Sequence, residues 1–150
     1  MWKLMIADDE PKIRRGLRAQ IEHMGLDIEI AAEAEDGERA LERAGSVHPD
    51  ILLVDINMPF LNGLDFIERL KKAQSGARII VITGFEEFEY ARRAVSLGVS
   101  AYLLKPVELS ALRAALDGAI QQMLEERERE KHFAWALSRL EKRRESLREE

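Results

Sequence analysis

Three carboxylates, a threonine and a lysine each follow a short apolar run of this sequence directly. They are Asp8 and Asp9, Asp55, Thr83 and Lys105. Carboxylates that meet at one place repel one another unless a cation lies between them, and Mg²⁺ prefers such oxygen ligands. A lysine adds positive charge for a bound anion, and a threonine adds a hydroxyl donor. If these side chains meet, the chemistry they favour is phosphoryl transfer to an aspartate nucleophile, with Asp55 as the candidate.

Parallel strands are the elements that would bring these side chains together. Ile51–Val54 and Ile79–Ile82 are continuous apolar runs, which are typical of strands buried on both faces. Between residues 28 and 35 apolar residues alternate with glutamates, which predicts a strand at the edge of the sheet. With the apolar segments before Asp8 and Lys105, five strands alternate with five helical patterns along the chain.

Strands separated by helices form parallel sheets with right-handed crossovers. The buried and edge patterns favour the strand order 2-1-3-4-5, a flavodoxin-like doubly wound α/β fold with an extended C-terminal helix from about Val107. In that order the ends of the first and third strands are neighbours, at the edge where open α/β sheets bind ligands. Asp8, Asp9 and Asp55 are therefore expected to lie side by side.

The same residues, in this order, resemble the receiver domain of two-component response regulators, over residues 1 to about 120. The matching motifs are Asp8-Asp9, Asp55 with Met58-Pro59 and Gly63, Thr83-Gly84, and Lys105-Pro106.

The resemblance implies a metal site and a phosphoacceptor. Asp55 would accept a phosphoryl group from a histidine kinase. Asp9 and Asp55 would bind Mg²⁺ together with the main-chain carbonyl of Asn57, and Asp8 would act mostly through water. The chain would thus be a phosphoacceptor switch with slow self-phosphorylation and autodephosphorylation rather than a metabolic enzyme.

The resemblance also implies roles for three residues on the later strands. Lys105 would pair with the phosphoryl oxygens, and a cis peptide before Pro106 would direct the lysine inward. Thr83 would move toward the phosphoryl group, and Tyr102 would change rotamer beside it.

Other interpretations of the same residues remain open. Asp8-Asp9 would also suit a helix N-cap. A Mg²⁺-dependent phosphohydrolase would use an aspartyl-phosphate too, although such enzymes usually carry a second acid where this chain has Asn57. A dimerisation module with a silent pocket is a third possibility.

Residues 121–150 form a separate segment, in which a heptad pattern continues the last helix. The pattern begins at Leu109, Leu112, Leu116, Ala119 and Met123. Phe133, Leu137, Leu140 and Leu147 continue the same steps, interrupted by Glu126, Glu130 and Arg144. We expect a coiled-coil extension that makes a parallel homodimer. The alternative is a single amphipathic helix that folds back on its own domain, or a partly frayed tail.

Composition narrows the partners. The formal net charge of -5 argues against direct nucleic-acid binding by these residues. No apolar run approaches the roughly 20 residues that span a bilayer, and with Cys 0 there is no disulfide framework. We therefore expect a cytoplasmic protein without a membrane partner. A coiled-coil linker after a receiver resembles AraC-type transcription regulators, whose DNA-binding domain would follow these residues.

Overall fold

A five-stranded parallel sheet forms the centre of the computed structural model, which describes residues 1–149, with side chains to residue 147. Its strand order is β2-β1-β3-β4-β5, so the predicted flavodoxin-like arrangement is confirmed. Every neighbouring pair of strands is parallel. The strands are β1 (Trp2–Ala7), β2 (Ile28–Ala34), β3 (Ile51–Val54), β4 (Arg78–Thr83) and β5 (Ala101–Leu104).

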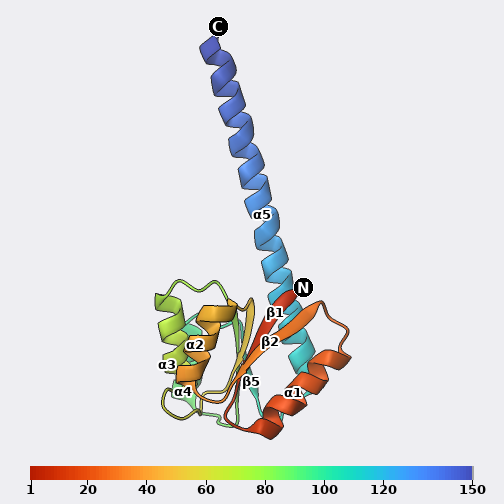
Figure 1. Cartoon of the computed structure of the whole chain (residues 1–150), viewed down its shortest axis with the longest axis vertical. Coiled ribbons are helices and arrows are strands. Elements are labelled where there is room, and N and C mark those ends of the chain that lie inside the picture. Colours follow the sequence, from red (N-terminus) through yellow and green to blue (C-terminus); the bar gives the residue numbers. More distant parts are fainter. Residues whose placement is uncertain (150) are drawn as a thin grey trace. The chain divides into compact units, whose positions relative to one another are not determined.

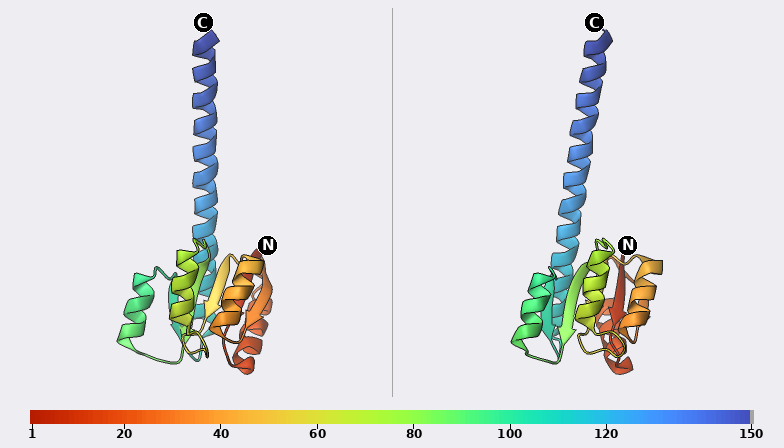
Figure 2. Two further views of the ribbon diagram at one scale, coloured as in Figure 1. Left: turned by 60° about the vertical axis from the view of Figure 1, so that its left-hand side comes forward. Right: turned by 90° about the vertical axis from the view of Figure 1, so that its left-hand side faces the viewer.

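Helices lie on both faces of this sheet. Figure 1 shows α2, α3 and α4 on one side and α1 on the other, and the turned views in Figure 2 agree. Contacts between α2 and α3 and between α3 and α4 join the first group into a layer. The helices are α1 (Pro11–His23), α2 (Gly37–Val47), α3 (Gly63–Lys72), α4 (Phe88–Ser96) and α5 (Leu109–Glu149).

The central strands are buried on both faces because helices cover both. Successive residues of β3 point to opposite sides, and all four are fully or almost fully buried. Leu52 and Val54 belong to the apolar cluster that also contains Phe66 and Ile67 of α3. The edge strand β2 stays partly exposed along most of its length, as its alternating glutamates predicted. This sheet gives the strand ends a rigid base.

A proline marks the start of α1, and N-cap side chains mark the starts of α2 and α3. Pro11 occupies the first turn of α1, where its missing N–H costs nothing. The side chains of Asp36 and Asn62 accept main-chain N–H groups at the starts of α2 and α3. The N-cap residue of α1 is Glu10, which makes no side-chain cap bond, so Asp8 and Asp9 are not the caps of this helix.

The chain divides into two compact units, residues 1–116 and 117–150, and α5 begins in the first and makes up the second. Helix α5 begins at Leu109, two residues after the expected start, and its main-chain N–H at Leu112 bonds to Glu108 at 3.0 Å. It is continuous to Glu149, and Glu150, where we expected it to end, lies outside the described residues. Among the described residues, no helix has the length and apolar character that crossing a membrane requires.

Candidate functional site

The end of β1 carries a group of three acidic side chains. Asp8 is only 2% exposed, whereas Asp9 and Glu10 are exposed. Oxygens of all three carboxylates lie within 4.8 Å of one another. The main-chain N–H of Asp8 bonds to Ala34 at 3.0 Å, which extends the β1–β2 pairing by one residue. The ladder itself therefore holds Asp8 at the rim of the sheet, and Asp9 and Glu10 follow it directly in the chain.

Asp55 follows β3 directly and is 4% exposed. Its main-chain N–H bonds to the carbonyl of Ala7 at 2.9 Å, which places it beside Asp8 on the neighbouring strand. Its Oδ1 accepts the N–H of Asn57 at 3.2 Å. The prediction that strands one and three bring their acidic ends together thus agrees with the backbone pairing.

Lys105 joins the two buried carboxylates. Its Nζ donates to Asp55 Oδ2 at 3.0 Å and lies 2.8 Å from Asp8 Oδ2. It also lies 3.9 Å from Glu10 Oε1. The main-chain N–H of Lys105 bonds to Thr83 at 2.8 Å, so the lysine is anchored at the end of the β4–β5 pair. The Lys105–Pro106 peptide is cis, as the resemblance implied.

Burial and charge shift two pKa values here in the same direction for different reasons. Burial raises the pKa of Asp55, and the neighbouring charge of Asp8 adds to this, while the hydrogen bond from Lys105 acts against it. Burial by itself lowers the pKa of Lys105, but its interactions with the carboxylates of Asp8 and Asp55 outweigh that effect and leave its pKa raised. Lys105 is therefore protonated at neutral pH, and its positive charge faces the carboxylates of Asp8 and Asp55.

The oxygen donors fit a hard divalent cation. Asp8 Oδ2 is buried and forms no hydrogen bond within the described residues, although Lys105 lies at ion-pair distance. An ion pair supplies charge but leaves lone pairs of this oxygen for a metal ion or its water. Together with Asp9 and Glu10, the donor set is all carboxylate oxygen, which suits Mg²⁺ rather than a softer metal.

Thr83 and Tyr102 meet at the loop after β4 rather than at Asp55. Thr83 is fully buried, and its Oγ1 accepts the N–H of Phe85 at 3.3 Å. The Tyr102 hydroxyl donates to the carbonyl of the same Phe85, also at 3.3 Å. Neither hydroxyl bonds to Asp55 in the part of the chain that the structure describes. Both residues expected to act as switches therefore hold one loop.

Two glycines allow the loop after Asp55 to pack closely, which the sequence did not reveal. A Cβ atom on Gly63 would lie 2.1 Å from the main-chain oxygen of Asp55. A Cβ atom on Gly37 would lie 1.9 Å from the main-chain oxygen of Leu61 in the same loop. Real Cβ atoms do not approach backbone so closely, so only glycine fits at either place.

Arg14 is a further residue that sequence reasoning missed. Its Nη1 donates to the main-chain oxygen of Asp8 at 2.6 Å, and its Nε lies 3.4 Å from Glu33 on β2. Its position, five residues after Asp9 and near the start of the helix that follows, was the only signal in the sequence. It holds the backbone of the acidic segment in place.

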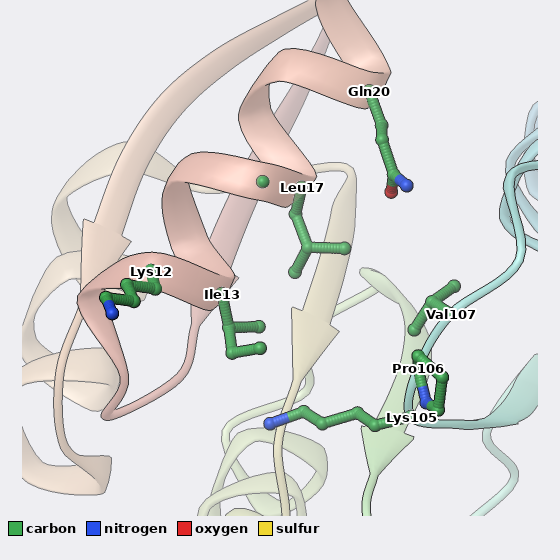
Figure 3. A pocket seen from close by; sticks show the side chains of 8 residues that line it. Lys12, Ile13, Leu17, Gln20, Lys105, Pro106 and Val107 are labelled. Carbon is green, nitrogen blue, oxygen red and sulfur yellow. The ribbon is translucent and has the colours of Figure 1, made fainter.

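A shallow groove of about 210 Å³ adjoins the site on the α1 side. Figure 3 shows Lys105 at one end of it, with Ile13 and Leu17 of α1 opposite Pro106 and Val107. The groove therefore lies between α1 and the segment that connects β5 to α5.

Curated relatives match much of this chain. YesN of Bacillus subtilis, described as an uncharacterized transcriptional regulatory protein, is 34% identical over 82% of the chain and 33% of its own length. The nitrate/nitrite response regulator NarL of Escherichia coli is 36% identical over 77% of the chain and 53% of its own length. The chain thus spans a third to about half of these relatives. The transcriptional regulatory protein PdtaR of Mycobacterium tuberculosis is 34% identical over 95% of the chain and 68% of its own length.

Solved structures and a family model complete the comparison. The REC domain of AraT, a response regulator from Geobacillus stearothermophilus, aligns with a TM-score of 0.75 at 41% identity, over 83% of this chain and 98% of that one. A LuxR-family response regulator from Staphylococcus aureus aligns with a TM-score of 0.75 at 28% identity, over 79% of this chain and 98% of that one. The model of the response regulator receiver domain matches residues 4–117. The chain therefore belongs to the response regulator receiver family of two-component systems, as its strand-end residues predicted.

Proposed function

We propose that this chain is a phosphorylation-controlled switch in which Asp55 accepts a phosphoryl group from a histidine kinase. The observation that carries the proposal is the shared ion pair of Lys105 with Asp8 and Asp55, two buried carboxylates from neighbouring strands. Such a site fixes the position of the carboxylate and provides a cation for the additional negative charge of a phosphoryl group, as an aspartyl-phosphate requires.

The transfer step follows from the position of Asp55. One oxygen of its carboxylate forms a bond to phosphorus while the bond between phosphorus and the donor nitrogen breaks, and the nitrogen keeps the electron pair. Asp8 and Asp9 would hold Mg²⁺ together with Asp55 and the main-chain carbonyl of Asn57. Bound there, the ion would neutralise charge on the transferring group. Lys105 would turn from the carboxylates to a phosphoryl oxygen.

The switch would work through the loop at Phe85. When the Thr83 hydroxyl moves to donate to a phosphoryl oxygen, the N–H of Phe85 loses its acceptor. The carbonyl of Phe85 holds the Tyr102 hydroxyl, so the loop and Tyr102 would move together. Phosphorylation would thereby shift an equilibrium between two arrangements of the face formed by α4, β5 and α5.

The output would lie beyond these residues. Two relatives with transcriptional regulatory names, YesN and PdtaR, are longer than this chain, which supports a transcriptional output domain that binds DNA in the whole protein. We further propose that residues 121–150 form a coiled-coil extension through which two copies associate. The heptad steps and the exposed leucines of α5 support this.

Acetyl phosphate tests the phosphoacceptor. With Mg²⁺ present, the wild-type chain should gain the mass of one phosphoryl group, and Asp55→Asn should gain none. Asp27→Asn is the matched control, because Asp27 is exposed and distant in sequence from the site. A wild-type chain that gains no mass, or an equal gain on Asp55→Asn, would exclude the assignment.

A further inference from the structure

Large apolar side chains are exposed along the second half of α5. Phe133 and Leu140 are 64% and 63% exposed, and Leu137 is 44% exposed. Because α5 is continuous, steps of three and four residues keep them on one stripe of the helix. We call this stripe the seam. Between residues 126 and 144 it consists of Glu126, Glu130, Phe133, Leu137, Leu140 and Arg144.

Trp135 does not belong to the seam. It lies on the outer face of α5, where the His132 ring stacks with it at a centroid distance of 5.9 Å. The Arg139 guanidinium lies 4.9 Å from its ring centroid. These neighbours on its own helix cover part of the indole, so a partner helix needs only the seam.

The parallel pair that the heptad pattern led us to expect does not suit the charges of the seam when the two copies are in register. In a parallel pair the two-fold axis runs along the coil, and each seam residue meets its own copy. Glu126 would then face Glu126, Glu130 would face Glu130, and Arg144 would face Arg144. Like charges that meet at the centre of a coiled coil favour other orientations.

An antiparallel second copy matches opposite charges. With the pair centred on residue 135, each seam residue meets the one equally far on the other side. Glu126 then faces Arg144, and Phe133 faces Leu137. By two-fold symmetry each contact occurs twice. Among the charged seam residues, only Glu130 faces an apolar residue, Leu140. A shift by one heptad in either direction separates Glu126 from Arg144, so charge also fixes the register.

The positions that flank the seam do not decide the orientation. In the antiparallel pair Arg127 lies near Glu141, which is favourable, and Arg129 lies near Arg143, which is not. In a parallel pair the flanking charges between residues 129 and 141 lie opposite alanines. The preference therefore comes from the seam itself.

We propose that residues 126–144 bind the same segment of a second copy as an antiparallel coiled coil, held in register by Glu126 and Arg144. This inference rests on the self-association proposed above and not on the role of Asp55. Failure of the pairing would therefore leave the acetyl phosphate result unchanged. With Phe133, Leu137 and Leu140 as its apolar contacts, the pair is short, and its formation depends on protein concentration.

Spin labels test the orientation, because the chain has no cysteine of its own. Ser138→Cys and Ser146→Cys place single labels on exposed positions outside the seam. In the antiparallel pair the two labels at 146 are offset along the coil by about 33 Å, and those at 138 by about 9 Å, at 1.5 Å per residue. We expect the distance at 146, measured by double electron–electron resonance, to exceed that at 138 by roughly 15 Å. Equal distances, or no dipolar coupling at either site, would overturn the proposal.

A charge exchange tests the register independently. Arg144→Glu places glutamate against Glu126 of the other copy and should raise the Kd of the dimer about tenfold, measured by sedimentation. Adding Glu126→Arg should restore the wild-type Kd. Lys142→Glu is the matched control, since it makes the same charge change on the outer face. A parallel pair would exchange one like-charge contact for another, so an unchanged Kd for Arg144→Glu, or no restoration, would contradict the antiparallel register.

Discussion

At the scale of single residues, the site is a balance between two buried carboxylates and one ammonium group. Lys105 lies within ion-pair distance of Asp8 and Asp55 together, so a single ammonium group faces two carboxylates. The raised pKa of Asp55 shows that burial and the charge of Asp8 outweigh the lysine. Folding therefore disfavours the charged form of Asp55, and a bound cation or a neutral side chain at this position would remove that unfavourable contribution.

Asp55→Asn should stabilise the folded chain at neutral pH without Mg²⁺. It removes the buried charge while Lys105 keeps its pairing with Asp8, and the gain should be on the order of 1 kcal/mol. In the wild type, the pKa of Asp55 is higher in the folded chain than the ordinary value of 3.8. As the pH rises above 3.8, the unfolded chain therefore loses this proton before the folded chain does, and the free energy of unfolding falls. Below 3.8 both states are protonated, and the difference should vanish.

Urea unfolding at neutral and acid pH measures this difference. Asp27→Asn serves as the exposed control and should not differ from wild type by more than a few tenths of a kcal/mol. A neutral-pH loss of stability in Asp55→Asn would show that its pairing with Lys105 dominates over burial.

The sequence predicted which charged residues meet but not what holds them. Asp8, Asp55 and Lys105 could be placed together because parallel strands end at one edge of a sheet. Arg14 could not, because its bond to the carbonyl of Asp8 depends on how α1 packs beside β2. The sequence likewise did not predict that Thr83 accepts the N–H of Phe85, because this bond depends on the conformation of the loop after β4.

At the scale of elements, buried strands are the feature that sequence patterns identify best. Ile51–Val54 is apolar throughout because helices cover both of its faces, and the order of the sheet follows from which strands are so covered. Close approaches between loops leave no periodic signal. Glycine is required at positions 37 and 63 because another part of the backbone lies very close there. That closeness depends on the folded structure and leaves no pattern in the sequence.

Gly63→Ala should therefore damage the loop that follows Asp55. The added Cβ would lie 2.1 Å from the main-chain oxygen of Asp55, so the start of α3 must shift. We expect a loss of about 2–4 kcal/mol in the free energy of unfolding and slower phosphorylation by acetyl phosphate.

Gly45→Ala provides the comparison for that variant. Gly45 lies in the exposed part of α2, and its added Cβ meets nothing within 4 Å. Alanine there should be neutral or stabilising by up to about 1 kcal/mol, because it favours the helix. If both variants unfolded at the same urea concentration, close packing at Gly63 would not be the reason for its glycine.

At the scale of the whole molecule, the proposed Mg²⁺ site at the end of β1 would couple the stability of the folded chain to the metal ion. A cation that binds the folded chain alone stabilises it by RT ln(1 + [L]/Kd), about 2.7 kcal/mol at one hundred times the Kd. Only the folded chain brings Asp8 and Asp55 together, since they are 47 positions apart (55 − 8) in the sequence. Metal binding should therefore appear in the unfolding of the whole first unit, residues 1–116.

The Tm of the wild-type chain should accordingly rise as Mg²⁺ is added, and the Tm of Asp9→Asn should rise much less. Asp9 is exposed, so this variant should keep the metal-free Tm of the wild type while it removes one proposed ligand. Glu22→Gln, an exposed acid on α1 away from the strand ends, should respond to Mg²⁺ as the wild type does. Calorimetry over a range of Mg²⁺ concentrations measures all three. Equal responses from Asp9→Asn and wild type would place the ion elsewhere, because a ligand that contributes binding free energy cannot be removed without reducing the linked gain in stability.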